Sequence, residues 1–290
     1  MTLALQSTFV RFELPHPGGS GTLAISVART TGPAEPGTVP VLIVLDGDMA
    51  AGPAAEIARL RGASGQVPTC MVVAVGYGVT DFMEFAQRRT ADLTPPISEA
   101  GRAAMGALSG FVGDKDGGAE AFLTLLAGPL RAAIVERYPE ASATEHVLFG
   151  HSLAGLFTAY ALLTRPDAFA GYHANSPSLW WDQFAMLGRL PAFRETLAAT
   201  GARPRVLIGV GGKEQDAPTK APAHIPMSLE EAQALVAVCR MVDAAVEFAA
   251  ALREAGLAEV GSVVFADEDH GSVVVPALNR AVALAAPATD

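Results

Sequence analysis

Short apolar runs, each ending in a turn-rich segment, constrain this 290-residue chain more than any other feature. They cover residues 39–45, 69–76 and 205–210. Runs of this kind are typical of strands that are buried on both faces of a sheet. Segments with helical spacing of apolar residues, such as residues 153–163, alternate with them. The alternation predicts an α/β fold with a mostly parallel central sheet and helices on both faces.

The two ends of the chain complete this pattern. Residues 8–14 and 22–29 are strand-like and flank a turn-rich break, which predicts an antiparallel N-terminal hairpin. Residues 228–257 begin with a capping-box sequence and end near a glycine, which predicts one long helix. Residues 77–116 lack clear periodicity, so we expect a long irregular region there. No interdomain linker is evident, and we expect a single domain over residues 1–290.

Composition excludes several classes of function. Half of the residues are hydrophobic and only 17% are charged, which permits a large buried core. No apolar run reaches the roughly 20 residues that a membrane-spanning helix needs. The net charge is −10, and no basic stripe interrupts the acidity. We therefore expect no membrane insertion and no nucleic acid as a partner.

The cysteines and the N-terminus carry little chemistry. Cys70 and Cys239 lie in apolar segments without metal-binding spacing, so two buried free thiols are expected. The first residues lack the basic and apolar regions of a secretory signal, which predicts a cytoplasmic protein. The sequence leaves the oligomeric state open.

The strongest chemical signal surrounds Ser152. A strand expected at residues 145–149 leads through Gly150 to Ser152, and a helix-like segment follows at once. This setting is typical of a nucleophile elbow, in which a strained turn presents a serine hydroxyl at the carboxyl end of the sheet. The second small residue of that pattern is usually glycine, and here it is Ala154. Ser152 is the predicted nucleophile, with an ordinary helix N-cap as the alternative.

A serine nucleophile needs a general base, and His270 is the best placed of the six histidines. It follows the last expected strand, residues 260–266, and should therefore lie at the same edge of the sheet as Ser152. α/β-Hydrolases also place the catalytic histidine last in the chain. His224, in an irregular segment, is the reserve candidate.

A third residue should orient the histidine and stabilise its protonated form. The strand expected at residues 205–210 is followed by Glu214 and Asp216, and we favour Glu214. Asp216 is one alternative. A serine–histidine pair without a strong acid is the other.

Two backbone N–H groups should form an oxyanion hole, the site that stabilises the negative oxygen of a tetrahedral intermediate. One is expected at Leu153, directly after the nucleophile. The other is expected at Gly47 or Asp48, which follow the strand of residues 39–45. An ordinary turn is the alternative for residues 46–48.

Four larger side chains are candidates for binding substrate. Trp180 and Trp181 follow the strand expected at residues 169–174, where they could line an aromatic pocket. Core packing is the alternative, and we expect it for one of the two. Arg88 and Arg89 are expected to hold an anionic or catecholate substrate, or else to form a solvated or salt-bridged pair.

Several segments together resemble the esterase family of the α/β-hydrolase fold that includes the ferric siderophore (enterobactin and salmochelin) esterases. They are residues 45–48, residues 88–89 with 92–95, and residues 150–155, 176–181 and 269–273. Many hydrolases share the elbow, whereas the combination of Arg-Arg, Ser-Pro-Ser-Leu-Trp-Trp and His-Gly-Ser is more specific. The resemblance runs from about residue 8 to the C-terminus.

The resemblance implies hydrolysis of a carboxylic ester through an acyl-enzyme formed on Ser152, with His270 transferring the proton. The substrate could be a serine trilactone carrying catechols. Iron would then arrive bound to the substrate, and no cofactor or catalytic metal is expected. Acyl transfer to a sugar or other alcohol uses the same motifs and is an alternative. A non-catalytic binding protein of the same fold is the alternative from another class.

Overall fold

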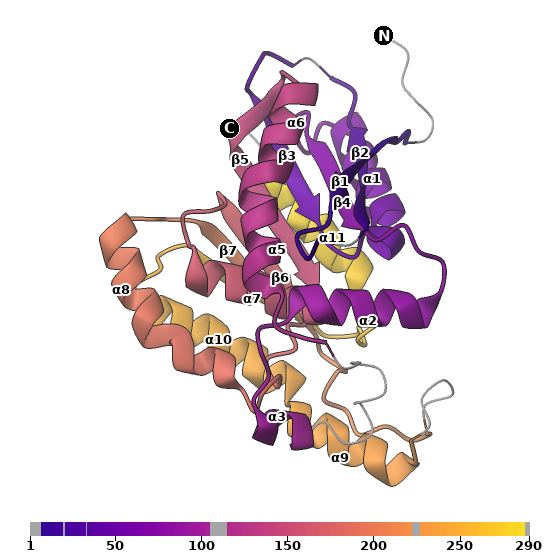
Figure 1. Ribbon diagram of the computed structural model, residues 1–290, viewed down its shortest axis with the longest axis vertical. Coiled ribbons are helices and arrows are strands. Elements are labelled where there is room, and N and C mark those ends of the chain that lie inside the picture. The colour runs from indigo at the N-terminus through magenta and orange to yellow at the C-terminus, as the bar shows by residue number, and fades with distance from the viewer. Residues whose placement is uncertain (1–6, 20, 33, 105–114, 222–226, 288–290) are drawn as a thin grey trace.

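The computed structural model describes residues 7–19, 21–32, 34–104, 115–221 and 227–287. Within these ranges, eight strands form one sheet in the order β1-β2-β4-β3-β5-β6-β7-β8 (Figure 1). The strands are β1 Val10–Pro15, β2 Thr22–Arg29, β3 Val39–Val44, β4 Met71–Gly76, β5 Ala141–His151, β6 Gly171–Asn175, β7 Arg205–Gly211 and β8 Val260–Phe265.

The strand pairing brings the carboxyl ends of the central strands to one edge of the sheet. The predicted catalytic residues follow these strand ends. β4, β3, β5, β6, β7 and β8 pair in parallel, whereas β1 and β2 form an antiparallel hairpin that joins β4. Val44 lies beside Phe149, and Gly150 lies beside Ala174, so the carboxyl ends of the central strands coincide. The predicted α/β-hydrolase fold, with its parallel sheet and N-terminal hairpin, is confirmed.

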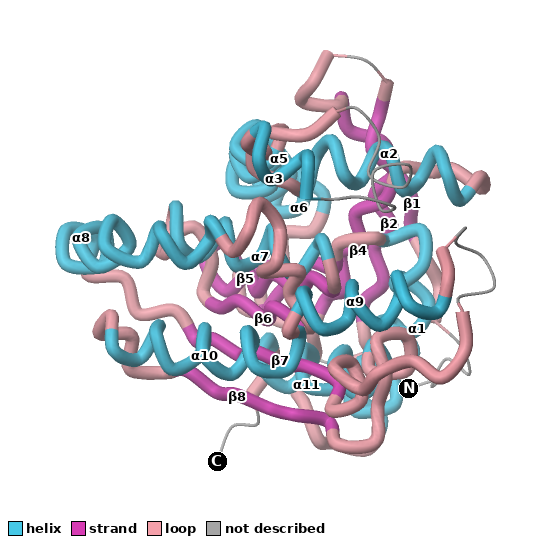
Figure 2. Tube along the Cα trace, turned by 90° about the horizontal axis from the view of Figure 1, so that it is seen from below, coloured by secondary structure: helices cyan, strands magenta, loops and turns pink. Residues whose placement is uncertain are grey.

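Helices cover both faces of the sheet (Figure 2). α1 and α11 pack on one face, and α5, α6, α7 and α10 pack on the other. The helices are α1 Gly47–Ala63, α2 Phe82–Leu93, α3 Glu99–Ala104, α5 Ala119–Leu125, α6 Arg131–Arg137, α7 Leu153–Thr164, α8 Leu190–Thr200, α9 Leu229–Cys239, α10 Met241–Glu254 and α11 Val274–Ala285.

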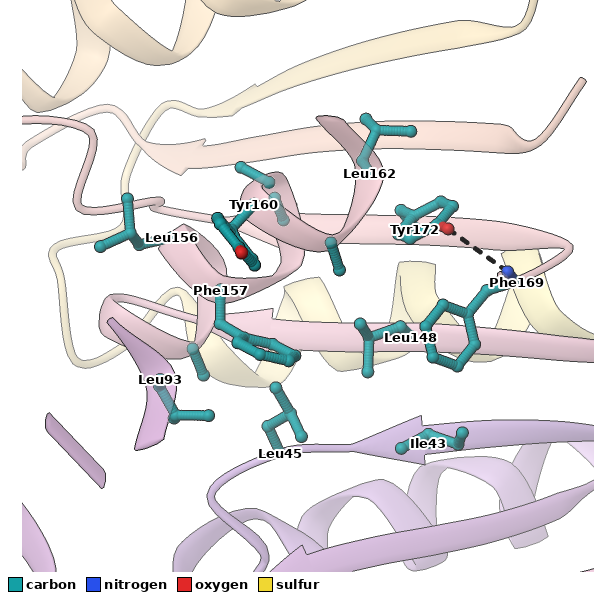
Figure 3. Close-up of a cluster of buried hydrophobic side chains, with 14 of the residues drawn as sticks. Ile43, Leu45, Leu93, Leu148, Leu156, Phe157, Tyr160, Leu162, Phe169 and Tyr172 are labelled. Carbon is teal, nitrogen blue, oxygen red and sulfur yellow. Dashed lines mark hydrogen bonds between the residues drawn. The ribbon is translucent and has the colours of Figure 1, made fainter. Parts of the chain in front are cut away.

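The coverage of both faces explains why the central strands are apolar throughout. In β3, Ile43 faces the core beneath α7, whereas Leu42 and Val44 face the core beneath α1 and α11. Ile43 lies among side chains that include Leu148 of β5 and Phe157 of α7 (Figure 3). Successive strand residues point to opposite faces, so a strand between two helical layers needs apolar residues at every position.

Two expectations about local structure are wrong. Residues 77–116 contain α2 and α3, because the carboxylate of Asp81 caps α2 by accepting the N–H of Glu84 at 2.8 Å. The helix expected over residues 228–257 is divided into α9 and α10 at Arg240, whose φ of 46° is left-handed. The predicted capping box at the start of α9 is present.

Both cysteines are free and buried, as expected. Burial raises the pKa of the Cys70 thiol to about 11 and that of Cys239 to about 12. In the described ranges, no helix combines the length and the apolar character needed to cross a membrane. The same ranges contain no group of three or more His, Cys, Asp or Glu residues placed to hold a metal ion.

His173 of β6 is a buried titratable residue that makes the stability of the fold depend on pH. Its ring is fully buried and packs edge-on against Phe149, with the ring centroids 5.2 Å apart. Neither ring nitrogen has a hydrogen-bond partner among the described residues. Burial lowers the pKa of His173 from 6.5 to about 3. The unfolded chain therefore binds a proton at a pH where the folded protein does not.

This difference predicts a loss of stability in mild acid. Below about pH 6.5 the unfolded state gains a proton on His173, so the free energy of unfolding should fall by about 1.4 kcal/mol per pH unit. The variant His173→Phe keeps a ring against Phe149 but cannot titrate. Between pH 7 and pH 5 it should lose about 2 kcal/mol less than the unmodified protein, measured by urea unfolding. Equal losses in the two proteins would contradict this account.

Candidate active site

Ser152 occupies the sharp turn between β5 and α7. Its φ of 62° and ψ of −120° are unfavourable for a residue with a side chain. The turn brings Gly150 against α7, so a Cβ at Gly150 would lie 2.0 Å from the carbonyl oxygen of Ala154. Glycine is therefore required before the serine. Ala154 itself is fully buried in the core, so the position where glycine is usual accepts a methyl group.

A second glycine is required one residue after Ala154. A Cβ at Gly155 would lie 2.6 Å from the carbonyl oxygen of Asn175 and 3.0 Å from the Cα of Pro177. The loop that follows β6 thus packs directly on the backbone of α7, beside the turn that carries Ser152.

The loops at the carboxyl ends of β5, β7 and β8 bring together three of the predicted residues. The Ser152 hydroxyl lies 3.1 Å from Nε2 of His270, and Nδ1 of His270 lies 2.5 Å from Oε2 of Glu214. In the tautomer that fits both contacts, Nδ1–H donates to the carboxylate and Nε2 accepts from the hydroxyl. Asp216, the alternative acid, is exposed. His224, the reserve base, lies outside the described residues.

The carboxylate of Glu214 is held on both oxygens. Oε1 accepts the N–H of Gly211 at 2.6 Å and the hydroxyl of Ser176 at 2.5 Å, while Oε2 faces His270. The side chain of Glu214 is only 1% exposed. Three donors offset the loss of water around the buried carboxylate, and they fix its orientation toward the imidazole.

His270 is presented by a tight turn. The Oδ1 atom of Asp269 accepts the N–H groups of Gly271 and Ser272, both at 2.9 Å. These two hydrogen bonds lower the pKa of Asp269. The side chain of His270 remains 49% exposed, so one face of the imidazole is accessible to a substrate.

His151, within the elbow, packs beside the imidazole of His270. The two ring centroids are 4.6 Å apart, and Nδ1 of His151 accepts a hydrogen bond from Asn175 at 2.9 Å. Burial, together with the nearby His270 and Arg89, lowers the pKa of His151 well below its ordinary value. A neutral His151 adds no positive charge that would oppose protonation of His270.

The backbone of the β3–α1 turn lies next to the elbow. The N–H of Leu45 donates to the carbonyl oxygen of Phe149 at 3.1 Å, which keeps the two segments together. In the described part of the chain, the N–H groups of Gly47 and Leu153 have no hydrogen-bond acceptor. Gly47 is required at its position because a Cβ there would lie 2.8 Å from the backbone of Val75. Both predicted donors are thus available at the same edge of the sheet.

Asp48 combines a hydrogen-bonded carboxylate with a backbone N–H that has no acceptor among the described residues. Its carboxylate accepts the N–H groups of Tyr77 at 2.6 Å and Gly78 at 2.7 Å. The side chain therefore ties α1 to the end of β4, while the backbone N–H of Asp48 remains a candidate donor beside that of Gly47.

Arg89 is paired within the protein, and its side chain is only 15% exposed. Its Nε and Nη2 atoms donate to the two carboxylate oxygens of Asp46 at 3.0 and 2.6 Å, and Nη2 lies 3.4 Å from the carbonyl oxygen of His151. The salt-bridged alternative is correct for this arginine. Asp46 has a left-handed φ of 54°, so Arg89 holds the turn that presents Gly47.

Comparisons with known proteins agree with this arrangement. The family model described as "Putative esterase" matches residues 32–251. The chain belongs to this esterase family. It is a carboxylic ester hydrolase, as the sequence predicted.

The names of several relatives of this esterase describe siderophore esterases or hydrolases. It is 31% identical over 253 residues to a siderophore triacetylfusarinine C esterase of Aspergillus fumigatus, covering 86% of this chain and 82% of the relative. It is 34% identical over 215 residues to a siderophore enterobactin esterase of Emericella nidulans, covering 73% and 70%. The solved structure of the siderophore hydrolase EstA from Aspergillus nidulans has a TM-score of 0.79 at 29% identity, over 94% of this chain and 92% of that one.

The two tryptophans of the esterase differ in exposure. Trp181 is only 1% exposed, and its Nε1–H donates to the carbonyl oxygen of Pro95 at 3.2 Å. It belongs to the core, as expected for one of the two tryptophans. Trp180 is partly exposed and lines a cavity of about 310 Å³. The cavity's other lining residues are Gly101, Ala104, Asp182, Gln183, Phe184, Leu235, Val238 and Cys239.

Arg88 lines a larger cavity, of about 830 Å³, between α2 and the β1–β2 turn. Nη1 of Arg88 lies 3.5 Å from a carboxylate oxygen of the exposed Glu84, and its guanidinium lies over the Tyr77 ring. The other lining residues are His16, Gly18, Gln87, Ala91, Asp92, Lys115, Asp116, Gly117 and Gly118.

Sequence reasoning missed four residues that touch the predicted ones. Asp46, His151, Asn175 and Ser176 were not assigned roles, although each stands at or just after the carboxyl end of a central strand. Polar residues at those positions were the available signal, because this edge carries the chemistry in α/β folds.

The two neighbouring arginines should differ sharply in their effect on stability. Arg89→Gln leaves the largely buried Asp46 without its cation and should lower the free energy of unfolding by about 2–3 kcal/mol. Arg88→Gln is the matched control on the same helix. It removes a long contact with the exposed Glu84 and the contacts of the guanidinium with Tyr77, but it leaves no buried carboxylate without a cation. It should lower the free energy of unfolding by less than about 1 kcal/mol. Denaturant unfolding measures both, and equal losses would contradict the role given to Arg89.

Proposed function

We propose that this esterase hydrolyses ester bonds of siderophores, using Ser152 as nucleophile, His270 as general base and Glu214 as the acid of the triad. The observation that carries the proposal is the position of His270, which hydrogen-bonds Ser152 through one ring nitrogen and Glu214 through the other. A serine becomes an effective nucleophile when a base adjoins it and a third group orients that base.

The same contacts support an ordinary acyl-enzyme sequence. The Ser152 oxygen attacks the ester carbonyl carbon while its proton passes to Nε2 of His270. Glu214 stabilises the imidazolium, and the N–H of Leu153, together with that of Gly47 or Asp48, donates to the oxygen that becomes negative. The imidazolium then protonates the leaving alcohol. Water attacks the acyl-enzyme by the reverse proton transfers, releasing the carboxylic acid and restoring Ser152.

The larger cavity carries cations that could contact an anionic group of a substrate. Its two carboxylates have cationic or histidine partners, since Asp92 contacts His16 at 2.8 Å and Asp116 pairs with Arg102. Lys115 has no ion-pair partner among the described residues. Arg88, which lies 3.5 Å from the exposed Glu84, and Lys115 are the two cations of the lining that could contact catecholate or carboxylate groups of a substrate.

The cavity is also at a suitable place. The register Ala24–Gly76 puts the β1–β2 turn at the same sheet edge as the elbow. Three strand spacings separate β2 from β5, which is about 14 Å. An extended, multi-armed ester could therefore place one arm in this cavity while a second ester bond lies at Ser152. The names of the fungal relatives support the same class of substrate.

Iron-loaded tricatecholate trilactone should be opened to linear products by this protein. Chromatography of the reaction mixture measures the products over time. Ser152→Ala and His270→Ala should remove the activity without unfolding the protein, because each removes a group that handles the transferred proton. Full activity in a folded Ser152→Ala variant would contradict the mechanism. Hydrolysis of a p-nitrophenyl ester without opening of the trilactone would leave the mechanism standing and reject the siderophore.

Arg88 should influence binding of charged substrates more than chemistry. For Arg88→Ala we expect KM for an anionic ester to rise about tenfold, while KM for a neutral p-nitrophenyl ester changes little, since a single charge contact is worth about 1.4 kcal/mol. Steady-state kinetics on the two esters gives the comparison. Equal changes in both KM values would show that Arg88 does not bind the anionic group of the substrate.

A further inference from the structure

The segment from the last residue of β6 into the following loop, residues 175–178, is hydrogen-bonded to Ser152 and Glu214 of the predicted triad. The carbonyl oxygen of Asn175 accepts the N–H of Ser152 at 3.0 Å, and the N–H of Ser178 donates to the carbonyl oxygen of Ser152 at 3.1 Å. Between these two contacts, the hydroxyl of Ser176 donates to Oε1 of Glu214 at 2.5 Å. One loop therefore holds the backbone of the nucleophile and the carboxylate of the acid.

Ser176 adopts a conformation that suits glycine better than serine. Its φ is 43°, its side chain is completely buried, and its N–H donates to the carbonyl oxygen of Gly209 at 2.7 Å. Left-handed backbone is unfavourable for a residue with a Cβ and costs nothing for glycine. A side chain retained under this strain, beside a catalytic carboxylate, points to a use for its hydroxyl.

The direction of the Ser176 hydroxyl is fixed by its neighbour. The Nδ2 group of Asn175 donates to Nδ1 of His151 at 2.9 Å and to Oγ of Ser176 at 3.3 Å. Because Oγ accepts from Asn175, the hydroxyl proton is directed to Glu214. The chain of hydrogen bonds thus runs from His151 through the amide and the hydroxyl to the carboxylate that faces His270.

The hydroxyl decides how Glu214 is oriented. With Ser176 and the N–H of Gly211 both on Oε1, the other oxygen is left for His270. The side chain of Glu214 is 1% exposed, so water has little access to replace a lost donor. Without the hydroxyl, one donor remains on Oε1 and the carboxylate can rotate away from the imidazole.

We infer that Ser176 is a positioning residue for the hydrolysis: it fixes the Glu214 carboxylate and, through it, the imidazole that activates Ser152. The inference rests on the proposed function, since it assigns no role to Ser176 apart from the triad. A merely structural buried serine would behave differently, because its loss would weaken folding and leave the reactivity of Ser152 unchanged.

The test compares two variants that lack the hydroxyl. Ser176→Ala removes it and keeps the unfavourable backbone, whereas Ser176→Gly removes it and relieves the strain. Thr90→Val is the control, because Thr90 is also buried and its hydroxyl donates only to Ala86 within α2. The rate of covalent labelling of Ser152 by an alkyl fluorophosphonate, with kcat and KM for a p-nitrophenyl ester, measures reactivity independently of the siderophore.

Both Ser176 variants should label about 10- to 100-fold more slowly, with kcat reduced similarly and KM unchanged, as expected for the loss of one charge-assisted hydrogen bond. Thr90→Val should label at the unmodified rate. In a Glu214→Ala background the substitution Ser176→Ala should have no further effect, because a residue that acts only through Glu214 shows complete non-additivity.

Two outcomes would overturn the inference. Labelling of both Ser176 variants at the unmodified rate would show that the hydroxyl is not needed. Effects of Ser176→Ala and Glu214→Ala that multiply in the double variant would show that Ser176 acts by another route. Neither outcome bears on the proposed function, which is tested separately by the activity of Ser152→Ala and by the opening of the trilactone. Thermal unfolding of each variant separates loss of reactivity from loss of fold.

Discussion

The predicted active site depends on two places where backbone segments lie so close together that a Cβ atom does not fit between them. The carbonyl oxygen of Ala154 lies where a Cβ of Gly150 would have to stand, and the carbonyl oxygen of Asn175 lies where a Cβ of Gly155 would stand. These contacts pack the elbow between the core of α7 and the loop after β6. They hold Ser152 at a backbone conformation that it would not adopt on its own.

The same close packing places the charges. Glu214 is buried and receives three hydrogen bonds, whereas His270 is half exposed on a turn capped by Asp269. The loops that carry them are tied together, since the N–H of Gly212 donates to the carbonyl oxygen of Phe265 at 2.8 Å. A fixed acid and an accessible base suit a histidine that must contact both Ser152 and a substrate. The electrostatics therefore follow from where the strands end.

The sequence predicted those parts of the molecule that depend on local pattern. Apolar runs identified the central strands, and chain order with strand ends predicted Ser152, His270 and Glu214, which the structure brings together. Prediction from the sequence failed where tertiary contacts determine the local structure. Nothing in the local pattern shows that the single residue Arg240 turns left-handed and divides a helix, or that Trp181 rather than Trp180 enters the core. The capping aspartate of α2, Asp81, is a readable signal within a segment that otherwise lacks clear periodicity.

The two arginines show why chemistry is easier to infer from sequence than substrate. Arg88 and Arg89 are adjacent and equal in charge, yet α2 directs Arg89 to the buried carboxylate of Asp46 and Arg88 to a cavity. The first contact supports the turn of the predicted oxyanion hole, which every ester substrate would use. The second faces a cavity formed partly by the β1–β2 turn, whose side chains contribute nothing to the triad. Catalytic geometry is constrained by close backbone packing, whereas the cavity walls can change without disturbing it. A family resemblance carried by the packed elements therefore transfers the reaction more securely than the substrate.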